Sequence, residues 1–90
     1  MTDDPHIRLK RLRFRSWHRG TKEADLILGG FADAHLASLD KRQLDDFEAL
    51  LEAPDADVVA WVSGGRAIPD VYRTPLMNRL LAFDFAKRAR

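Results

Sequence analysis

Arg19, Gly20 and Glu23 are the residues best suited to bind another molecule, and they lie within the stretch Arg-Gly-Thr-Lys-Glu. An arginine offers a planar fork of five N–H donors that matches a carboxylate, a carbonyl group or a phosphate. The glycine lets another backbone approach closely, and the glutamate can orient the arginine fork or accept from a partner. No apolar residue lies between Gly20 and Glu23, so the stretch is not typical of a packed core. We therefore predict a partner-binding site here, with further candidates at the flanking residues Arg15, His18, Lys22 and Asp25.

A second interpretation of this stretch is a surface ion pair between Arg19 and Glu23 across the turn. In either case Gly20 is expected at an exposed helix junction, and no apolar neighbour is available to bury the charged pair. Exposed substitutions usually change stability by no more than about 0.5 kcal/mol. We therefore expect Arg19→Ala and Glu23→Ala to melt close to the wild-type temperature.

The rest of the sequence holds no constellation typical of an enzyme. The three histidines are far apart, at His6, His18 and His35, and no cluster supplies the three or four ligands that zinc needs. There is no glycine-rich phosphate loop, and the serines lack a neighbouring base. The carboxylates between positions 40 and 57 are interpreted as a solvated helix face. We expect no catalytic residue, no metal site and no tightly held cofactor.

Charge is unevenly distributed along the chain. Residues 1–22 have a net charge of +5, residues 23–57 of −8 and residues 58–90 of +4. This pattern fits packing of the acidic middle beside the basic ends, and it also fits a partner with a patterned surface.

The basic segment 8–22 supports an alternative function, because its arginines and lysines are interleaved with Phe14 and Trp17 and resemble a nucleic-acid-binding module. Against it, the pI is only about 8.2 and the acidic middle would repel nucleic acid. We expect one or both aromatic residues to lie in the core.

Composition limits the class of protein. Ninety residues with 46% hydrophobic and 32% charged residues indicate one globular domain. The absence of cysteine excludes disulfides and thiolate zinc sites, and it fits a reducing compartment. No run of 18 apolar residues could span a membrane. The acidic, polar first residues resemble neither a signal peptide nor a transit peptide.

Five short helices are predicted to position these residues. The first runs from Ile7 to a stop at Gly20, and the second is capped by Thr21. The apolar spacing of the second helix is interrupted by Gly29-Gly30, where the helix either breaks or packs closely against a neighbour.

The other three helices have clear start signals. Asp40 and Gln43 form a capping box for the third, which Pro54 is expected to end. The fourth starts at Asp55 or Asp57 and stops at Gly64-Gly65, and the fifth opens with Thr74-Pro75. We expect the fifth helix to carry Phe85 on its apolar face and basic residues 87–90 at its end.

The predicted fold is therefore all-α: a small five-helix bundle, with residues 1–90 as a single helical domain and residues 1–6 as a flexible N-terminus. Helical periodicity places the following residues in one core: Leu44, Phe47, Leu51, Trp61, Leu80 and Leu81.

The stretch from Arg19 to Glu23 matches the Arg-Gly-x-x-Glu signature of the succinate dehydrogenase assembly factor 2 family, the bacterial and mitochondrial "flavinators". The resemblance covers roughly residues 8–85 and includes Asp25, the apolar run 26–28, Phe31, the Leu-Leu-Glu at 50–52, Pro54-Asp55, Asp57 and Trp61. The chain departs from common members at Trp17 and at Gly29-Gly30.

This resemblance implies a function. Such proteins are small helical bundles that bind the flavoprotein subunit of succinate dehydrogenase, or of fumarate reductase, and promote covalent attachment of FAD to a histidine of that subunit. It implies that the chain is an assembly factor and not an enzyme, and that FAD belongs to the client protein. It also implies that Arg19, Gly20 and Glu23 face the client. Without a transit peptide, we expect the bacterial cytoplasm and not the mitochondrial matrix.

Overall fold

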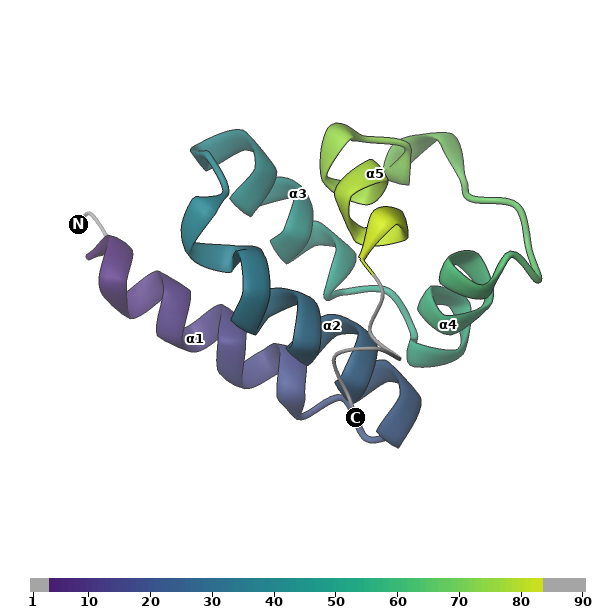
Figure 1. Ribbon diagram of the computed structural model, residues 1–90, viewed down its shortest axis with the longest axis horizontal. Coiled ribbons are helices and arrows are strands. Elements are labelled where there is room, and N and C mark those ends of the chain that lie inside the picture. Colours follow the sequence, from purple (N-terminus) through teal and green to yellow (C-terminus); the bar gives the residue numbers. More distant parts are fainter. Residues whose placement is uncertain (1–3, 84–90) are drawn as a thin grey trace.

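The computed structural model describes residues 4–83, which form five α-helices and two 3-10 helices and contain no strand (Figure 1). The α-helices are α1 (Pro5–Trp17), α2 (Lys22–His35), α3 (Lys41–Leu50), α4 (Asp55–Ser63) and α5 (Pro75–Ala82). The 3-10 helices are η1 (Leu36–Ser38) and η2 (Asp70–Tyr72). The prediction of an all-α fold with five helices is confirmed.

The helix starts follow the capping signals of the sequence. The Thr21 side chain caps α2 by accepting from the Ala24 N–H, and the Thr74 side chain caps α5 by accepting from the Met77 N–H at 3.1 Å. Asp40 and Gln43 form the expected capping box at α3, with N–H to oxygen distances of 2.8 and 3.2 Å.

Two boundaries differ from those expected, and a third cannot be compared. Asp4 caps α1, which begins at Pro5, so two of the six residues expected to be flexible are helical. α3 ends at Leu50, and Pro54 does not end it but is the N-cap of α4. Positions 84–90, where an apolar Phe85 and a basic helix end were expected, lie outside the described residues.

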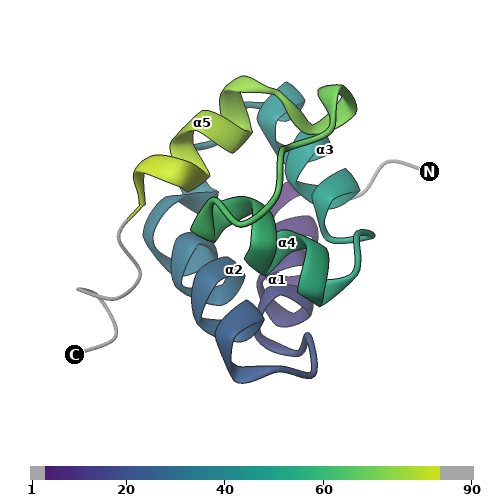
Figure 2. The same cartoon turned by 90° about the vertical axis from the view of Figure 1, so that its right-hand side faces the viewer.

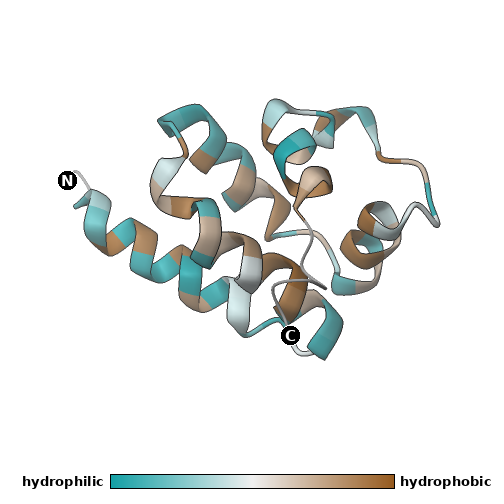
Figure 3. Ribbon diagram, in the orientation of Figure 1, coloured by the Kyte–Doolittle hydropathy of each residue, from teal (hydrophilic) through white to brown (hydrophobic). Residues whose placement is uncertain are grey.

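The α-helices form two groups, α2 with α1 and α4 on its sides, and α3 with α5 (Figures 1 and 2). α1 and α2 pack side by side as an antiparallel hairpin, α4 packs against α2, and α3 packs against α5. Hydrophobic residues gather toward the centre, where these helices come together (Figure 3).

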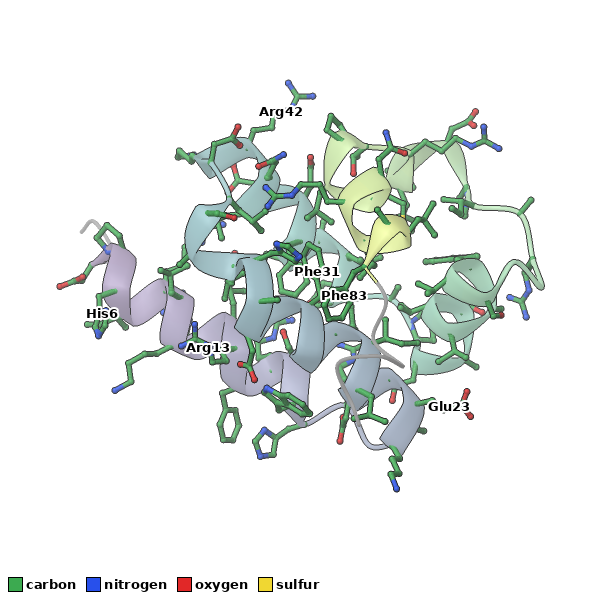
Figure 4. All side chains as sticks on the ribbon, viewed as in Figure 1. His6, Arg13, Glu23, Phe31, Arg42 and Phe83 are labelled. Atoms are coloured by element: carbon green, nitrogen blue, oxygen red, sulfur yellow. The ribbon has the colours of Figure 1, made fainter. Side chains whose placement is uncertain are left out.

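The core is built around Phe31, which Figure 4 labels at the centre of the molecule together with Phe83. The Phe31 ring centroid lies 5.8 Å from those of Phe47 and Phe83. Of the predicted core residues, the following are buried: Phe47, Leu51, Trp61 and Leu80.

Leu44 packs against this core but is only partly buried. The placement of Leu81 in the core is wrong, because its side chain is 43% exposed. The inward positions of the short helix α5 are taken by Leu76, Met77 and Leu80, which leaves Leu81 on its outer side.

α2 continues through Gly29-Gly30 without a break. Neighbouring aromatic rings occupy the space that side chains at these two positions would fill. A Cβ atom built on Gly29 would lie 2.3 Å from Cδ2 of Trp17, which is too close for any side chain there. One on Gly30 would lie 3.4 Å from the Phe83 ring. Trp17 of α1 and Gly29 of α2 are thus in contact with each other. Trp17 is half-buried on Gly29, whereas Phe14 is 62% exposed.

Candidate partner-binding site

The turn between α1 and α2 has a fixed shape. Gly20 has a φ of +108°, a backbone conformation that side chains disfavour, and it is exposed. The backbone N–H of Arg19 donates to Oδ1 of Asp25 at 2.7 Å, which ties the turn to the first turn of α2. The positive φ expected at Gly20 is present, but α1 already ends at Trp17 with His18 as its C-cap, so Gly20 lies in the turn and is not the helix stop. Asp25 holds this turn in place.

The Arg19 side chain connects this turn to the segment between α3 and α4. Its Nε donates to Oδ1 of Asp55 at 2.8 Å, and its two terminal nitrogens donate to the backbone carbonyls of Leu51 and Ala53. Leu51 is the C-cap of α3 and Ala53 lies beyond it, so neither carbonyl has a donor from a following helical turn and both need donors from elsewhere. The guanidinium supplies them, and only 10% of the Arg19 side chain remains exposed.

This geometry does not fit the expectations for Arg19. We expected an exposed side chain, a surface ion pair with Glu23, and an Arg19→Ala variant that melts close to the wild-type temperature. Arg19 pairs with Asp55, which is 36 residues away in the chain and only 19% exposed at its side chain. Sequence proximity favoured Glu23 as its partner, but the acceptors that need a donor lie at the end of α3. Asp55 and the two carbonyls are the functional groups that the sequence reasoning did not connect with Arg19. The Pro54-Asp55 pair, which is part of the resemblance described above, was the available signal.

Glu23 lies on the first turn of α2, on the side toward α4 (Figure 4). It is exposed, and its side chain forms no hydrogen bond or ion pair within residues 4–83. Glu23 lines a hollow of about 320 Å³ whose other walls are Thr21, Asp55, Ala56, Val59 and Ala60. This hollow combines carboxylates with small apolar side chains, so it suits a partner group that carries an N–H donor or a positive charge.

The remaining candidate residues divide into paired and exposed groups. Arg15 pairs with Glu52 and lies 3.8 Å from Glu48. Lys22 and His18 are exposed. The imidazole of His18 stacks on the Phe14 ring, with centroids 3.9 Å apart. Phe14 was not a candidate site residue, and its place on an exposed face became visible only in the structure.

The basic residues of α1 are largely matched by carboxylates from other helices. Arg8 donates to Asp45 at 2.7 Å and to Glu48 at 2.9 Å, and Arg13 lies 3.4 Å from Asp33. The hydrogen bond from Arg8 holds the pKa of Asp45 below its ordinary value, and the same bond raises the pKa of Arg8. The packing of the acidic middle beside the basic N-terminal segment is therefore confirmed.

The acidic residues on α3 were expected to be a solvated face. Asp46 differs from this expectation, because its Oδ2 is buried without a hydrogen-bond partner. In the part of the chain that the structure describes, no group of three or more His, Cys, Asp or Glu residues is placed to hold a metal ion. No helix in residues 4–83 is long and apolar enough to cross a membrane.

Comparison with known proteins gives a consistent result. A family model for Sdh5, described as the flavinator of succinate dehydrogenase, matches residues 10–84, which include the whole turn and its partners. The FAD assembly factor SdhE of Acetobacter pasteurianus is 37% identical over 79 residues, covering 88% of this chain and 72% of that protein.

Mitochondrial relatives match as well. Succinate dehydrogenase assembly factor 2 of Dictyostelium discoideum is 35% identical over 77% of this chain, and that of Meyerozyma guilliermondii is 41% identical over 82%. The chain spans about half the length of these two relatives, 49% and 57%. The match over residues 10–84 shows that the chain belongs to the Sdh5 family, the flavinators of succinate dehydrogenase.

Proposed function

We propose that this chain is an assembly factor that binds the flavoprotein subunit of succinate dehydrogenase, or of the related fumarate reductase, and promotes covalent attachment of FAD to it. The observation that carries the proposal is the family match over residues 10–84, which contains the Arg19–Glu23 stretch in its structural setting. The bacterial relative is named an FAD assembly factor, which agrees with this proposal.

Such a role requires binding and no catalytic residue on this chain. The formation of a bond between a histidine and a flavin relies on the chemistry of the flavin, and protein groups supply orientation. An assembly factor can favour the reactive conformation of its client only by binding that conformation more tightly than others. The chain then acts as a chaperone, and FAD remains the cofactor of the client.

The candidate residues take different parts in the proposed site. Gly20, Lys22 and Glu23 are exposed on one turn, so they are proposed to contact the client directly together with His18. The buried arginine fork is proposed to position them, because Arg19 joins this turn to Asp55 at the start of α4. Arg15 and Asp25 are likewise paired within the chain, with Glu52 and with the Arg19 N–H.

The alternative of nucleic-acid binding through segment 8–22 has no support from the comparisons. The geometry gives a physical reason, since carboxylates from later parts of the chain neutralise several of its basic residues, among them Arg8, Arg15 and Arg19. Location in the bacterial cytoplasm stays a prediction, because relatives occur both in bacteria and in mitochondria.

The test uses purified apo-flavoprotein subunit, FAD and this chain, with covalent flavin measured as fluorescence on a denaturing gel. Glu23→Ala should fold normally and lower the yield strongly, because it removes the exposed carboxylate of the site. Asp70→Ala is the matched control, since it removes an exposed carboxylate from η2. Equal yields for the two variants would remove Glu23 from the site, and no stimulation by the wild-type chain would refute the function.

A further inference from the structure

The outward face of α1 carries exposed apolar residues on a helix that is otherwise strongly basic. Ile7 is 54% exposed and Phe14 is 62% exposed, and both belong to the few large hydrophobic residues that are exposed among residues 4–83. They are seven residues apart, which places them on one face about 10.5 Å from each other along the helix. The opposite face of α1 buries Leu12 and Ser16.

Phe14 is held in one orientation. The His18 ring stacks on it with an interplanar angle of 17° and a centroid distance of 3.9 Å. Nδ1 of His18 lies 2.7 Å from the carbonyl oxygen of Phe14, and a carbonyl can only accept, so this nitrogen carries the hydrogen. A side chain that is already ordered loses less conformational entropy on binding, so the exposed Phe14 ring is a preorganised anchor for a partner.

The charges that α1 itself carries around this anchor have one sign. No acidic residue occurs between Pro5 and Lys22 in the sequence. The carboxylates that pair with Arg8, Arg13 and Arg15 come from α3, from α2 and from the segment after α3, so α1 itself contributes only basic charge to its outward face. On that face, Lys10 and Arg11 are exposed between the two apolar residues.

Resting on the proposed function, we propose that the α1 face formed by Ile7, Lys10, Phe14 and His18 is a second contact surface for the flavoprotein client. It fits an acidic protein surface that offers an apolar pocket for the Phe14 ring. Aromatic residues are enriched among interface hot spots, and complementary charges around them steer association.

A protein surface fits this face better than a lipid surface does. A helix that lies in a membrane buries a broad apolar face, whereas α1 exposes two large apolar residues two turns apart. The stacked Phe14–His18 pair also leads within two residues to Gly20, so the face continues directly from the turn that carries the partner-binding site.

The experiment measures affinity for the purified apo-flavoprotein subunit by titration calorimetry, at two salt concentrations. Phe14→Ala should weaken binding about thirtyfold, as a hot-spot truncation does. Lys10→Glu should weaken it about tenfold at low salt and less at high salt, because screening reduces the contribution of exposed charges. The matched controls are Val71→Ala, which is 75% exposed on η2, and Arg42→Glu, which reverses a charge on α3 (Figure 4). Both should bind within about twofold of the wild-type chain.

Two other possible partners of this α1 face, a membrane and a second copy of the chain, are tested with the same variants. Vesicles of phosphatidylglycerol and analytical centrifugation of the chain alone serve as probes for a membrane and for a second copy. The inference is overturned if Phe14→Ala and Lys10→Glu bind the client as tightly as the controls, or if Phe14→Ala abolishes only vesicle binding or only self-association. Failure of the wild-type chain to bind the flavoprotein would instead refute the proposed function, and this inference with it. All variants should retain the wild-type melting temperature, because the replaced side chains are exposed.

Discussion

Replacing Arg19 with alanine removes a side chain that makes three hydrogen bonds to a distant segment. These bonds reach Asp55 and the carbonyls of Leu51 and Ala53, and the arginine side chain is only 10% exposed. Each hydrogen bond to a charged group contributes about 1.5–3 kcal/mol, but the contributions within one network are not additive. Breaking a buried ion pair by removing one partner costs about 3–5 kcal/mol.

Partial hydration lowers this figure, because the Asp55 side chain is 19% exposed and water can reach it after the arginine is lost. We expect Arg19→Ala to lose about 2–4 kcal/mol of the free energy of unfolding. For a domain of this size, 1 kcal/mol corresponds to about 4–8 °C, so the melting temperature should fall by about 10–25 °C. Arg19→Lys should lose part of this stability, since an ammonium cannot reproduce the fork.

Thermal unfolding followed by circular dichroism measures the effect, with Arg42→Ala as an exposed arginine control on α3. Flavinylation then separates positioning from direct contact. Cooling the reaction should restore yield for Arg19→Ala, because more of the chain is folded, but it should not restore yield for Glu23→Ala. An Arg19→Ala protein that melts within about 2 °C of the wild type would refute the reasoning.

Three further changes test the packing and the electrostatics. Phe47→Ala should cost about 3–5 kcal/mol in urea unfolding, since the ring is fully buried, and a loss under about 1 kcal/mol would contradict its place in the core. Gly29→Ala should cost about 1–3 kcal/mol in the wild-type chain and clearly less in a Trp17→Ala background, because its Cβ meets the indole. Additive losses would show that the two positions do not interact. Because the hydrogen bond from Arg8 lowers the pKa of Asp45 below 3.8, its carboxylate stabilises the fold above that pH and this contribution is lost on further acidification. Asp45→Asn should therefore flatten the decline of the melting temperature below about pH 4, and an unchanged decline would contradict the pairing.

The helices could be predicted from the sequence because their signals are local. The Asp40–Gln43 capping box and the Thr74-Pro75 start involve residues within one helical turn, and the structure reproduces both. The close contact at Gly29 was left open, because glycine in a helix has the same local cost whether or not a ring lies against it. Only the position of Trp17 on the neighbouring helix decides it.

The exposed turn of the candidate site could be predicted from the sequence, but its internal geometry could not. The motif identified the exposed turn at Gly20 and the exposed Glu23. The partners of Arg19 are two backbone carbonyls and Asp55, more than 30 positions away, and no periodicity links them to the motif. Phe14 illustrates the same limit, since a helix made mostly of arginines and apolar residues does not reveal which face packs against the next helix.

The central claim is tested most directly by measuring covalent flavin on the succinate dehydrogenase flavoprotein subunit in cells that lack the gene for this chain. We predict that covalent flavin fluorescence on a denaturing gel is low in these cells. The wild-type chain should restore it, Asp70→Ala should restore it equally, and Glu23→Ala should not, although it is present as a folded protein. Full covalent flavinylation in the absence of this chain would contradict the account.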